Sequence, residues 1–520
     1  MSISGLADNI GRLLETSAAK YGGKSAIRFD AGGFAFTYGA LNKRVNQFAN
    51  VFQAHGIKAG QHVAVMLPNI PEFPVTWLAL AKLGAVMVPI NVRYQVADLE
   101  YVLNDSDAVG LVIHTEFADT FKEASPKLPN IDHIFRVGTG SEDVGSDINL
   151  LADRASEVFS AADLGLDDMV NIQYTSGTTG FPKGCILTHE YWLTIGKLVA
   201  DFMVQDDVFL SVTPFYYMDP QWEMLACLTI GATMVLAESY SPSGYMDLVR
   251  KHKATVSWAT MAPWILKQPP SDLDQQHKLR FVLVGGFPPN LHHEFEKRFN
   301  VVAREAYGMT EIGPGMFVEP DDDAMTGSGS VGKAFEVRPV RIVDAQGKDV
   351  AAGEIGELWI SGAGMFKGYY HKREATAEAF HGKWFKTGDL FREDENGYYY
   401  IVGRIKDMIR RSGDNVSASE VEGVLDTHPK ILSAAVVPVK DIDRGEEVKA
   451  YLVLKPGESP ETVPPEEVIA FCQEQIASFK IPRYIEYKEE FSLTPSGKIQ
   501  KHLLLKEKED LTEGCYDRLK

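Results

Sequence analysis

The sequence has few cysteines, no long apolar run and no excess of positive charge. Four cysteines in 520 residues lie far apart and include no C-x-x-C pair, so they predict neither a disulfide framework nor a cysteine-based metal site. We therefore expect a reducing compartment, the cytoplasm. Charges at Asp8, Arg12 and Glu15 occupy positions where a signal peptide needs an apolar core, which predicts no export signal.

Charge and hydropathy also argue against two kinds of partner. The longest apolar stretch, residues 75–90, contains Lys82 and Gly84 and is shorter than the roughly 20 residues of a membrane span. Lys and Arg number 52 against 71 Asp and Glu, a formal net charge of −19. Because this charge repels both a nucleic-acid backbone and an anionic membrane surface, we expect neither as a partner.

Two classes of hydrolase find no support in the sequence. Histidine and cysteine form no spaced cluster, and we interpret the pair His292 and His293 as a polar surface patch and not as metal ligands. A G-x-S-x-G motif, which a serine hydrolase would carry, does not occur.

The length and the hydrophobic pattern predict several α/β layers. A chain of 520 residues exceeds what one core usually supports, so we expect at least two domains. Apolar residues recur at helical spacing over residues 41–52, and residues 62–67, HVAVML, predict a buried strand after them. A helical stretch that passes through a glycine into a strand occurs twice, at 75–88 and 222–235, which indicates two α/β layers of similar design.

The composition of the sequence changes after Gly403, where a charged stretch begins, and we place a domain boundary near Lys406. Beyond it, residues 434–439 and 448–454 predict strands. A helix opening at Pro464 and Pro465 should follow, with Thr462 as its cap.

One segment combines the residue types that bind phosphate. The run YTSGTTGFPKG, residues 174–184, follows an apolar stretch. Glycines let backbone N–H groups approach phosphate oxygens, hydroxyl groups add donors, and lysine adds positive charge. It is not a Walker A loop, because Pro182 precedes the lysine and Gly184 follows it. A flexible surface loop is the alternative. The residues of the predicted phosphate loop are Thr175, Ser176, Gly177, Thr178, Thr179, Gly180 and Lys183.

A second glycine-rich run, GSGSVGK at residues 327–333, nearly fits the Walker A pattern. It follows three aspartates and not an apolar strand, and Ala334 stands where a Mg²⁺-binding hydroxyl group would be needed. We predict an ordinary loop there.

Five motifs in order resemble those of the adenylate-forming superfamily of acyl-CoA synthetases, luciferases and peptide-synthetase adenylation domains. After the phosphate loop come YGMTE (307–311), WFKTGDL (384–390), GRIKD (403–407) and PSGKI (495–499). The resemblance covers essentially the whole chain and is nearest in appearance to crotonobetaine/carnitine-CoA ligases. It implies an ATP-dependent acid–CoA ligase that uses Mg²⁺, forms an acyl adenylate and passes the acyl group to coenzyme A.

The resemblance also implies the architecture. A large layered α/β amino-terminal domain, residues 1–405, should bind AMP. A small mobile α+β carboxyl-terminal domain, residues 406–520, should carry the catalytic lysine, with the active site between the two domains.

The reaction itself sets requirements for the catalytic residues. Attack of a carboxylate on the α-phosphate of ATP brings anions together, so the site needs a cation at the reacting oxygens and a metal across the departing pyrophosphate. The resemblance implies that Lys498 bridges the carboxylate and the α-phosphate, that Thr310 contacts the α-phosphate and that Glu311 holds Mg²⁺.

The nucleotide requires a ribose clamp, for which an acidic residue that accepts from the hydroxyl groups is the usual solution. The resemblance gives this role to Asp389, with Arg404 assisting. By resemblance the adenine pocket consists of Gly285, Gly286, Tyr307 and Gly308, although Tyr307 is also compatible with a packed core aromatic.

Thioester formation requires the thiol of CoA to reach a carbonyl group that Lys498 has just covered, so the small domain should swing about a hinge. Lys406 occupies the hinge position of the family. Gly413 and Arg410 are weak candidates for contact with CoA, because a pair of solvated basic residues, Arg410 and Arg411, is the better explanation of the arginines.

The acyl pocket departs from the family pattern. The segment PFYYMDPQW, residues 214–222, has Tyr217 where the family usually has histidine, and Phe287 replaces a smaller residue. We predict a pocket lined by Tyr216, Tyr217, Trp222 and Phe287. Tyr216, Tyr217 and Trp222, with Asp219 as counter-ion, could form a cage for a trimethylammonium group. An aryl or short branched acid, or a packed aromatic wall, remain the alternatives.

Two other functions are compatible with the motifs. The first is an adenylating enzyme that delivers its acyl group to a carrier protein or oxidises it. The second is a non-catalytic relative that binds an acyl or nucleotide ligand.

Overall fold

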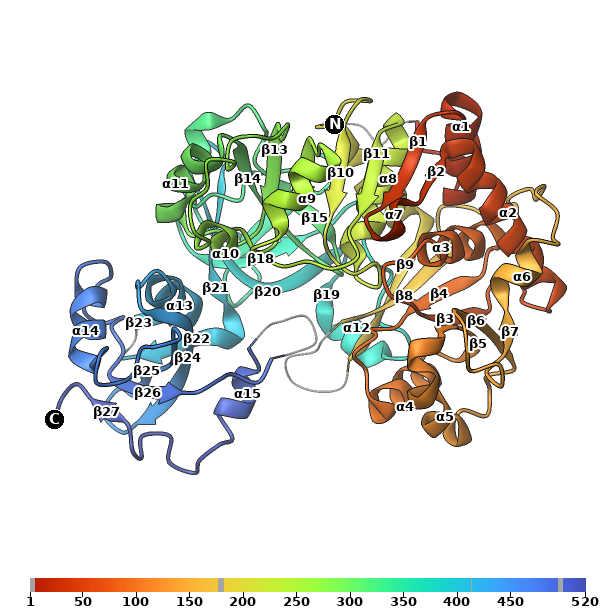
Figure 1. Ribbon diagram of the computed structural model, residues 1–520. Helices are drawn as coiled ribbons and strands as arrows, with labels where there is room; N and C mark the ends of the chain where they lie inside the picture. Colours follow the sequence, from red (N-terminus) through yellow and green to blue (C-terminus); the bar gives the residue numbers. More distant parts are fainter. Residues whose placement is uncertain (1–4, 176–181, 413, 494–498) are drawn as a thin grey trace. The chain divides into compact units, whose positions relative to one another are not determined.

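The computed structural model describes residues 5–175, 182–412, 414–493 and 499–520, and these residues form two compact units (Figure 1). The described parts of the larger unit are residues 5–175, 182–339 and 360–384. Those of the smaller unit are residues 340–359, 385–412, 414–493 and 499–520. This division follows packing alone, so the predicted boundary between residues 405 and 406 stays a prediction.

One sheet of the larger unit leads to the predicted phosphate loop. Its strands follow the order β7-β6-β5-β3-β4-β8-β9, with neighbours parallel except for the antiparallel pair β8 and β9. The strand predicted at 62–67 is β3, and every residue of it is buried. Its strands are β3 His62–Met66, β4 Val86–Pro89, β5 Ala108–His114, β6 His133–Val137, β7 Ser146–Asp147, β8 Met169–Thr175 and β9 Lys183–Thr188.

The second sheet of the larger unit has the order β16-β15-β14-β13-β12-β10-β11-β1-β2. Strands β10, β12, β13 and β14 are parallel neighbours in this sheet. Its strands are β1 Ser25–Phe29, β2 Ala35–Thr37, β10 Val208–Ser211, β11 Thr233–Leu236, β12 Val256–Trp258, β13 Phe281–Val284, β14 Val302–Met309, β15 Gly313–Phe317 and β16 Lys333–Ala334.

The helices of this unit include two matching helix-to-strand connections, as the sequence predicts. Helix α3 ends at Gly84 and α8 ends at Gly231, and both glycines adopt the left-handed backbone conformation, with φ of 84° and 78°. Each helix then passes directly into a parallel strand, β4 or β11. The helices are α1 Ile10–Tyr21, α2 Tyr38–Ala54, α3 Glu72–Leu83, α4 Val96–Asp105, α5 Ala118–Ala124, α6 Ile148–Ala152, α7 His189–Ala200, α8 Met218–Ile230, α9 Tyr245–His252, α10 Ala262–Leu266, α11 Pro289–Phe299 and α12 Arg373–Ala379.

Helices α3, α7 and α8 are buried on most sides, and α7 packs against α8. A helix that is apolar all round is typical of a position between two layers. The larger unit is therefore a layered α/β structure, which confirms the predicted fold class.

The smaller unit contains two sheets with helices beside them. Strands β17, β18, β20 and β21 are neighbours in one sheet, and β22 to β27 form the other. The predicted strands at 434–439 and 448–454 lie inside β24 and β25. The elements are β17 Val340–Val343, β18 Gly356–Ile360, β20 Trp384–Glu393, β21 Tyr399–Arg404, β22 Met408–Arg411, β23 Asp414–Ser417, α13 Ala418–Asp426, β24 Ile431–Asp441, β25 Gly445–Leu454, α14 Pro465–Gln473, β26 Tyr484–Lys488, α15 Lys501–Leu504 and β27 Tyr516–Asp517. The short β19, Phe380–His381, follows α12.

Two local predictions are wrong. Thr462 does not cap α14, since its hydroxyl oxygen accepts from the backbone N–H of Ser459 in the preceding turn and the cap position belongs to Pro464. His292 is not part of a surface patch but is 3% exposed. Its Nε2 donates to the carbonyl of Ala303 and its Nδ1 accepts from the N–H of Gly327, so burial and both bonds make it a structural residue.

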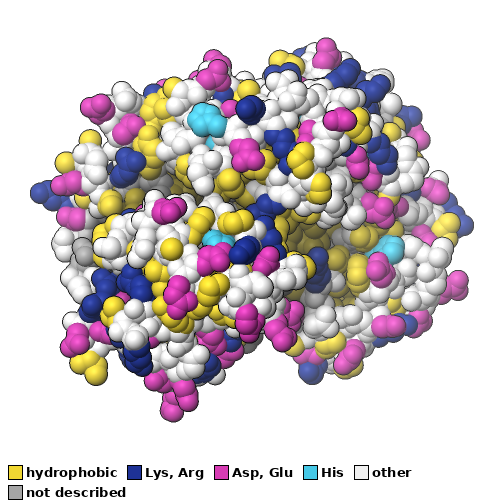
Figure 2. All heavy atoms as spheres, turned by 60° about the vertical axis from the view of Figure 1, so that its left-hand side comes forward, with side chains coloured by type: hydrophobic (Ala, Val, Ile, Leu, Met, Phe, Trp, Pro, Cys, Tyr) yellow, Lys and Arg dark blue, Asp and Glu magenta, His cyan; other side chains and the backbone are white. Residues whose placement is uncertain are grey.

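The predicted ordinary loop at residues 327–333 is confirmed, since it joins a short 3₁₀ turn to β16. In the part of the chain that the structure describes, no helix is both long and apolar enough to cross a membrane. Acidic and basic side chains are interspersed over the face shown in Figure 2.

Candidate functional site

The parallel strands of the second sheet bring three predicted segments to one edge. The acyl-pocket segment 214–222 follows β10, the adenine segment 285–287 follows β13, and the segment 307–311 ends β14 and continues beyond it. Since β10, β12, β13 and β14 are parallel, all their carboxyl ends meet at the same sheet edge. Ligands of open α/β sheets bind at such edges.

The predicted phosphate loop connects the antiparallel strands β8 and β9. Thr175 and Lys183 are Cα partners in this hairpin, and the hydroxyl group of Thr175 lies 3.4 Å from the carbonyl oxygen of Lys183. The apolar strand that should precede the loop is β8, in which Val170 and Ile172 are buried. The other predicted loop residues, Ser176, Gly177, Thr178, Thr179 and Gly180, lie outside the described residues.

Tyr369 brings Lys183 and Glu311 to one place. The Lys183 Nζ atom lies 4.1 Å from the centroid of the Tyr369 ring. The hydroxyl group of the same tyrosine donates a 2.8 Å hydrogen bond to Glu311 Oε1. The structure therefore joins the predicted phosphate-loop lysine and the predicted metal-binding carboxylate through a residue that no sequence motif had singled out.

The backbone around Thr310 and Glu311 is held from two sides. The Tyr191 hydroxyl group, on the buried helix α7, donates to the carbonyl oxygen of Thr310 at 2.8 Å. The Phe366 N–H donates to the carbonyl oxygen of Glu311 at 3.0 Å. Burial raises the pKa of Tyr191 well above its ordinary value, so its hydroxyl group stays a donor.

The predicted adenine residues Tyr307 and Gly308 lie at the end of β14. Tyr307 is 7% exposed, and the alternative of a packed core aromatic therefore remains open. A Cβ atom added at Gly308 would lie 2.6 Å from the carbonyl oxygen of Gly313, so the close approach of β15 requires glycine there.

Glu305 fixes the predicted adenine segment, and the sequence analysis missed it. Its Oε2 accepts from the N–H of Gly286 at 3.1 Å and its Oε1 accepts from the N–H of Phe287 at 2.7 Å. Burial raises the pKa of Glu305 to about 7, although the two backbone bonds act in the opposite direction. Glu305 is the one acidic residue of β14, whose other charged residue is Arg304, and this acidic residue within a strand was the available signal.

The second missed residue is Trp258, which ends β12 at the same sheet edge. A Cβ atom added at Gly285 would lie 3.3 Å from its ring. The ring of Trp222 lies 6.3 Å from that of Trp258, nearly perpendicular to it. The predicted adenine glycine and the predicted acyl-pocket tryptophan thus contact the same indole.

The remaining acyl-pocket candidates separate into two environments. The rings of Tyr216 and Tyr217 lie 4.7 Å apart, and Asn91 Nδ2 is 3.4 Å from the Tyr217 hydroxyl group. Burial raises the pKa of both tyrosines, while the positive charge of Arg93 opposes this rise. Phe287 instead packs against α11, with its ring 5.4 Å from that of Phe295.

The ribose candidates of the smaller unit are paired with each other. Asp389 and Arg404 are Cα partners on β20 and β21, and Arg404 Nε lies 2.9 Å from Asp389 Oδ1. Asp389 is 3% exposed, whereas the Arg404 side chain is half exposed. Lys498 lies outside the described residues, and the catalytic role predicted for it stays a prediction.

The hinge and CoA candidates lie on or next to a short turn and strand. Lys406 belongs to the 3₁₀ turn Ile405–Asp407 and is exposed. Arg410 is exposed on β22, whereas the neighbouring Arg411 forms a 2.8 Å ion pair with the fully buried Glu447. Gly413 lies outside the described residues. Of the two arginines, only Arg410 presents its side chain to solvent.

The residues present fit a Mg²⁺ ion that a nucleotide carries with it. Mg²⁺ is typically bound by one or two carboxylates together with substrate phosphates and waters. Glu311 supplies such a carboxylate, and the Tyr369 hydroxyl group donates a hydrogen bond to one of its two oxygens. Over residues 5–175, 182–412, 414–493 and 499–520, no group of three or more His, Cys, Asp or Glu side chains that could hold a metal ion occurs.

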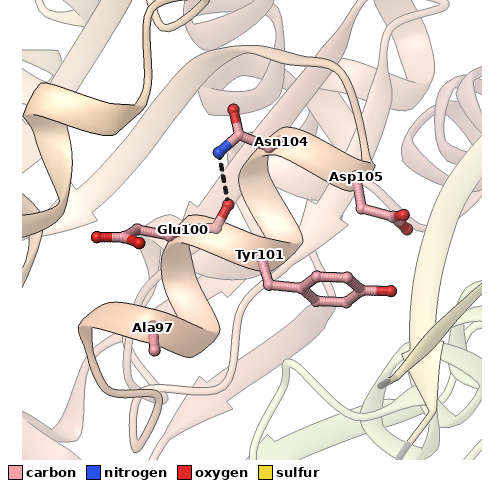
Figure 3. A pocket seen from close by; sticks show the side chains of 5 residues that line it. All are labelled: Ala97, Glu100, Tyr101, Asn104 and Asp105. Carbon is pink, nitrogen blue, oxygen red and sulfur yellow. Dashed lines mark hydrogen bonds between the residues drawn. The ribbon is translucent and has the colours of Figure 1, made fainter. Parts of the chain in front are cut away.

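A shallow depression of about 490 Å³ lies on helix α4 (Figure 3). Its side chains support neighbouring segments. The Tyr101 hydroxyl group donates to the carbonyl oxygen of Pro182, and Asp105 accepts from Tyr174 and Lys372. The helix thus braces the end of the phosphate loop, and we assign no ligand to the depression.

The chain matches known proteins along nearly its whole length. The model of the AMP-binding enzyme family matches residues 14–370, and that of the AMP-binding enzyme C-terminal domain matches residues 420–498. A crotonobetaine/carnitine–CoA ligase of Salmonella heidelberg (strain SL476) is 36% identical over 516 residues, which cover 95% of this chain and 98% of the relative.

Solved structures agree with the sequence matches. An anthranilate CoA ligase in complex with anthranoyl-AMP superposes with a TM-score of 0.88 at 27% identity, over 98% of this chain and 99% of that chain. ATP-bound MatB from Rhodopseudomonas palustris gives a TM-score of 0.86 at 29% identity, over 97% and 100% of the two chains.

The fold and the ordered motifs define an enzyme of the adenylate-forming class. The chain belongs to the AMP-binding enzyme family and, within it, to the acyl-CoA synthetases. It is an acid–CoA ligase that acts through an acyl adenylate, with ATP, Mg²⁺ and coenzyme A as the molecules it uses. The predicted family, enzyme class and cofactors are confirmed.

Proposed function

We propose that the enzyme activates a small carboxylic acid with an uncharged aryl or short branched group. The observation that carries this choice is the place of Arg93. Its backbone N–H donates to Asn91 Oδ1 at 3.0 Å, Asn91 Nδ2 lies 3.4 Å from the Tyr217 hydroxyl group, and the positive charge of Arg93 acts on both Tyr216 and Tyr217. A positive charge near the two tyrosines disfavours a cationic tail and leaves the ring faces for an apolar one.

A quaternary-ammonium acid is the second candidate. It is favoured by the 36% identity to a crotonobetaine/carnitine–CoA ligase and by Asp219 in the first turn of α8. The aryl candidate has its own support in the 27% identity to an anthranilate CoA ligase.

We assign the catalytic roles as follows. Lys498 bridges the acid and the α-phosphate, Thr310 contacts the α-phosphate, and Lys183 with the phosphate loop binds the β- and γ-phosphates. Asp389 and Arg404 hold the ribose. The adenine lies against Gly285, Gly286, Tyr307 and Gly308.

The reaction has two steps. A carboxylate oxygen of the acid attacks the α-phosphorus, the bond to the bridging oxygen breaks, and pyrophosphate leaves. The thiol of coenzyme A then loses its proton, its sulfur attacks the carbonyl carbon, and AMP leaves. Mg²⁺, when bound beside Glu311, offsets negative charge on the phosphates. A swing at Lys406 between the steps would uncover the carbonyl group for the thiol.

The test is release of pyrophosphate from ATP across a panel of acids, with and without coenzyme A. The panel contains benzoate, anthranilate, short branched acids and medium-chain acids. A matched pair, 4-trimethylammoniobutanoate and its carbon isostere 5,5-dimethylhexanoate, separates charge from shape. We expect higher kcat/KM for the uncharged member of that pair, with coenzyme A consumed.

Each other outcome has a defined meaning. Preference for the trimethylammonium member would overturn the choice of substrate in favour of the second candidate. Release without consumption of coenzyme A would indicate a carrier-directed or oxidative enzyme. Absence of release with every acid would indicate a ligand-binding relative without turnover.

A further inference from the structure

Tyr369 contacts two charged residues that belong to different motifs. One face of its ring lies under Lys183 Nζ, 4.1 Å from the centroid, and its hydroxyl group donates to Glu311 Oε1 at 2.8 Å. Tyr369 itself is 8% exposed, so both contacts are largely sheltered from water. Electrostatic contacts are stronger where water is excluded.

The backbone of Tyr369 is held in place by β9. The N–H of Ile186 donates to the carbonyl oxygen of Gly368 at 3.0 Å, and the N–H of Tyr370 donates to that of Gly184 at 2.8 Å. The N–H of Tyr369 itself donates to the hydroxyl oxygen of Thr376 at 2.9 Å. The ring is therefore attached to a short segment that pairs directly with β9, the strand carrying Lys183.

We propose that Tyr369 is a positioning residue that aligns the phosphate-loop lysine and the metal-binding glutamate for adenylate formation. Its ring face holds the ammonium group of Lys183 by a cation–π contact. Its hydroxyl group occupies one oxygen of Glu311 and so turns the other oxygen towards the Mg²⁺ of the nucleotide. This inference rests on the roles proposed above for Lys183 and Glu311.

The two contacts can be removed separately. Tyr369→Phe keeps the ring and loses the hydroxyl group, so it acts on Glu311 alone. Tyr369→Leu loses both contacts. Tyr370→Phe is the matched control, because it removes a hydroxyl group from the next residue, where the partner is the exposed Asp107 at 2.9 Å.

The first measurement is ATP binding by titration calorimetry in the absence of any acid, with and without Mg²⁺. For Tyr369→Phe we expect wild-type affinity for ATP in the absence of Mg²⁺. The Mg²⁺ concentration that gives half of the full increase in ATP affinity should be roughly tenfold higher than for the wild type, since a hydrogen bond to a charged group is lost. For Tyr369→Leu we expect the same change in Mg²⁺ dependence and, in addition, a lower affinity for ATP in the absence of Mg²⁺. Tyr370→Phe should match the wild type in both titrations.

A role of Tyr369 in packing alone predicts a different result, since its ring also lies 5.0 Å from that of Phe366. In that case one of two results would follow. Either Tyr369→Phe would keep the wild-type Mg²⁺ dependence of ATP binding, or both variants would lose affinity for ATP, with and without Mg²⁺, in proportion to a lower melting temperature. Either result would overturn the proposal.

The calorimetric comparison needs no turnover, so it separates this inference from the proposed function. If the wild type released no pyrophosphate with any acid, the proposed function would fail, yet the Mg²⁺ titrations would still decide the role of Tyr369.

Discussion

The replacement Glu305→Gln tests how the buried carboxyl group on β14 controls stability. Burial raises the pKa of Glu305 from 4.5 to about 7 in the folded protein. Between these values the folded chain keeps a proton that the unfolded chain has released. The contribution of this protonated carboxyl group to the free energy of unfolding is therefore fully present below pH 4.5 and is lost as the pH rises through 7.

The size of the effect follows from the shift. One pKa unit corresponds to about 1.4 kcal/mol, so this carboxyl group lowers the free energy of unfolding by about 3 kcal/mol between pH 4 and pH 8. Glutamine imitates the protonated carboxyl group and does not titrate. Its amide must lose one of the two backbone bonds, which adds a cost that does not depend on pH.

The assay is urea unfolding at several pH values, followed by tryptophan fluorescence. Six of the seven tryptophans, Trp222 and Trp258 among them, belong to the larger unit and Trp359 to the smaller one, so this signal mainly follows the unit that contains Glu305. We expect the difference in free energy of unfolding, variant minus wild type, to increase by about 3 kcal/mol from pH 4 to pH 8. Glu319→Gln makes the same chemical change at an exposed position and serves as the control. Parallel curves for Glu305→Gln and the wild type would refute the reasoning.

Three further predictions concern the reaction. Lys498→Ala should abolish acid-dependent ATP–pyrophosphate exchange but spare thioester formation from supplied acyl adenylate, and equal loss of both steps would contradict its assigned role. Lys406→Pro should slow thioester formation and spare the exchange reaction, because it restricts the backbone at the hinge; unchanged single-turnover thioester kinetics would remove the hinge assignment. Tyr217→Ala should change the kcat/KM ratio between acids by roughly tenfold with little effect on KM for ATP, and an unaltered acid profile would dismiss the pocket.

The sequence was sufficient for the features that local patterns encode. Helices α3 and α8 and the strands after them followed from apolar runs interrupted by Gly84 and Gly231. The apolar strand β8 before the glycine-rich segment followed from the same kind of run, whereas the phosphate-binding role of Thr175 and Lys183 stays a prediction.

The features that the sequence did not predict depend on sheet register. Tyr369 reaches Lys183 only because its own segment pairs with β9, and Trp258 reaches Gly285 only because β12 and β13 are neighbours. Neither pairing leaves a local pattern. His292 was misread for the same reason, since both of its hydrogen-bond partners come from other segments.

The pairing of residues 367–370 with β9 has a consequence for the order of assembly. A nascent chain that ends before Gly368 contains the predicted phosphate loop, all of β14 and Glu311, but not the segment that pairs with β9 and brings Tyr369 to Lys183 and Glu311. Contacts between such distant segments form late, because closing a long loop costs entropy before the contact repays it. The match to the family model ends at residue 370, directly after this segment. We therefore expect a fragment cut at residue 366 to fold its sheets around an unaligned lysine, and we expect Lys183 to be aligned only once the chain extends through Thr376, whose hydroxyl oxygen accepts from the N–H of Tyr369.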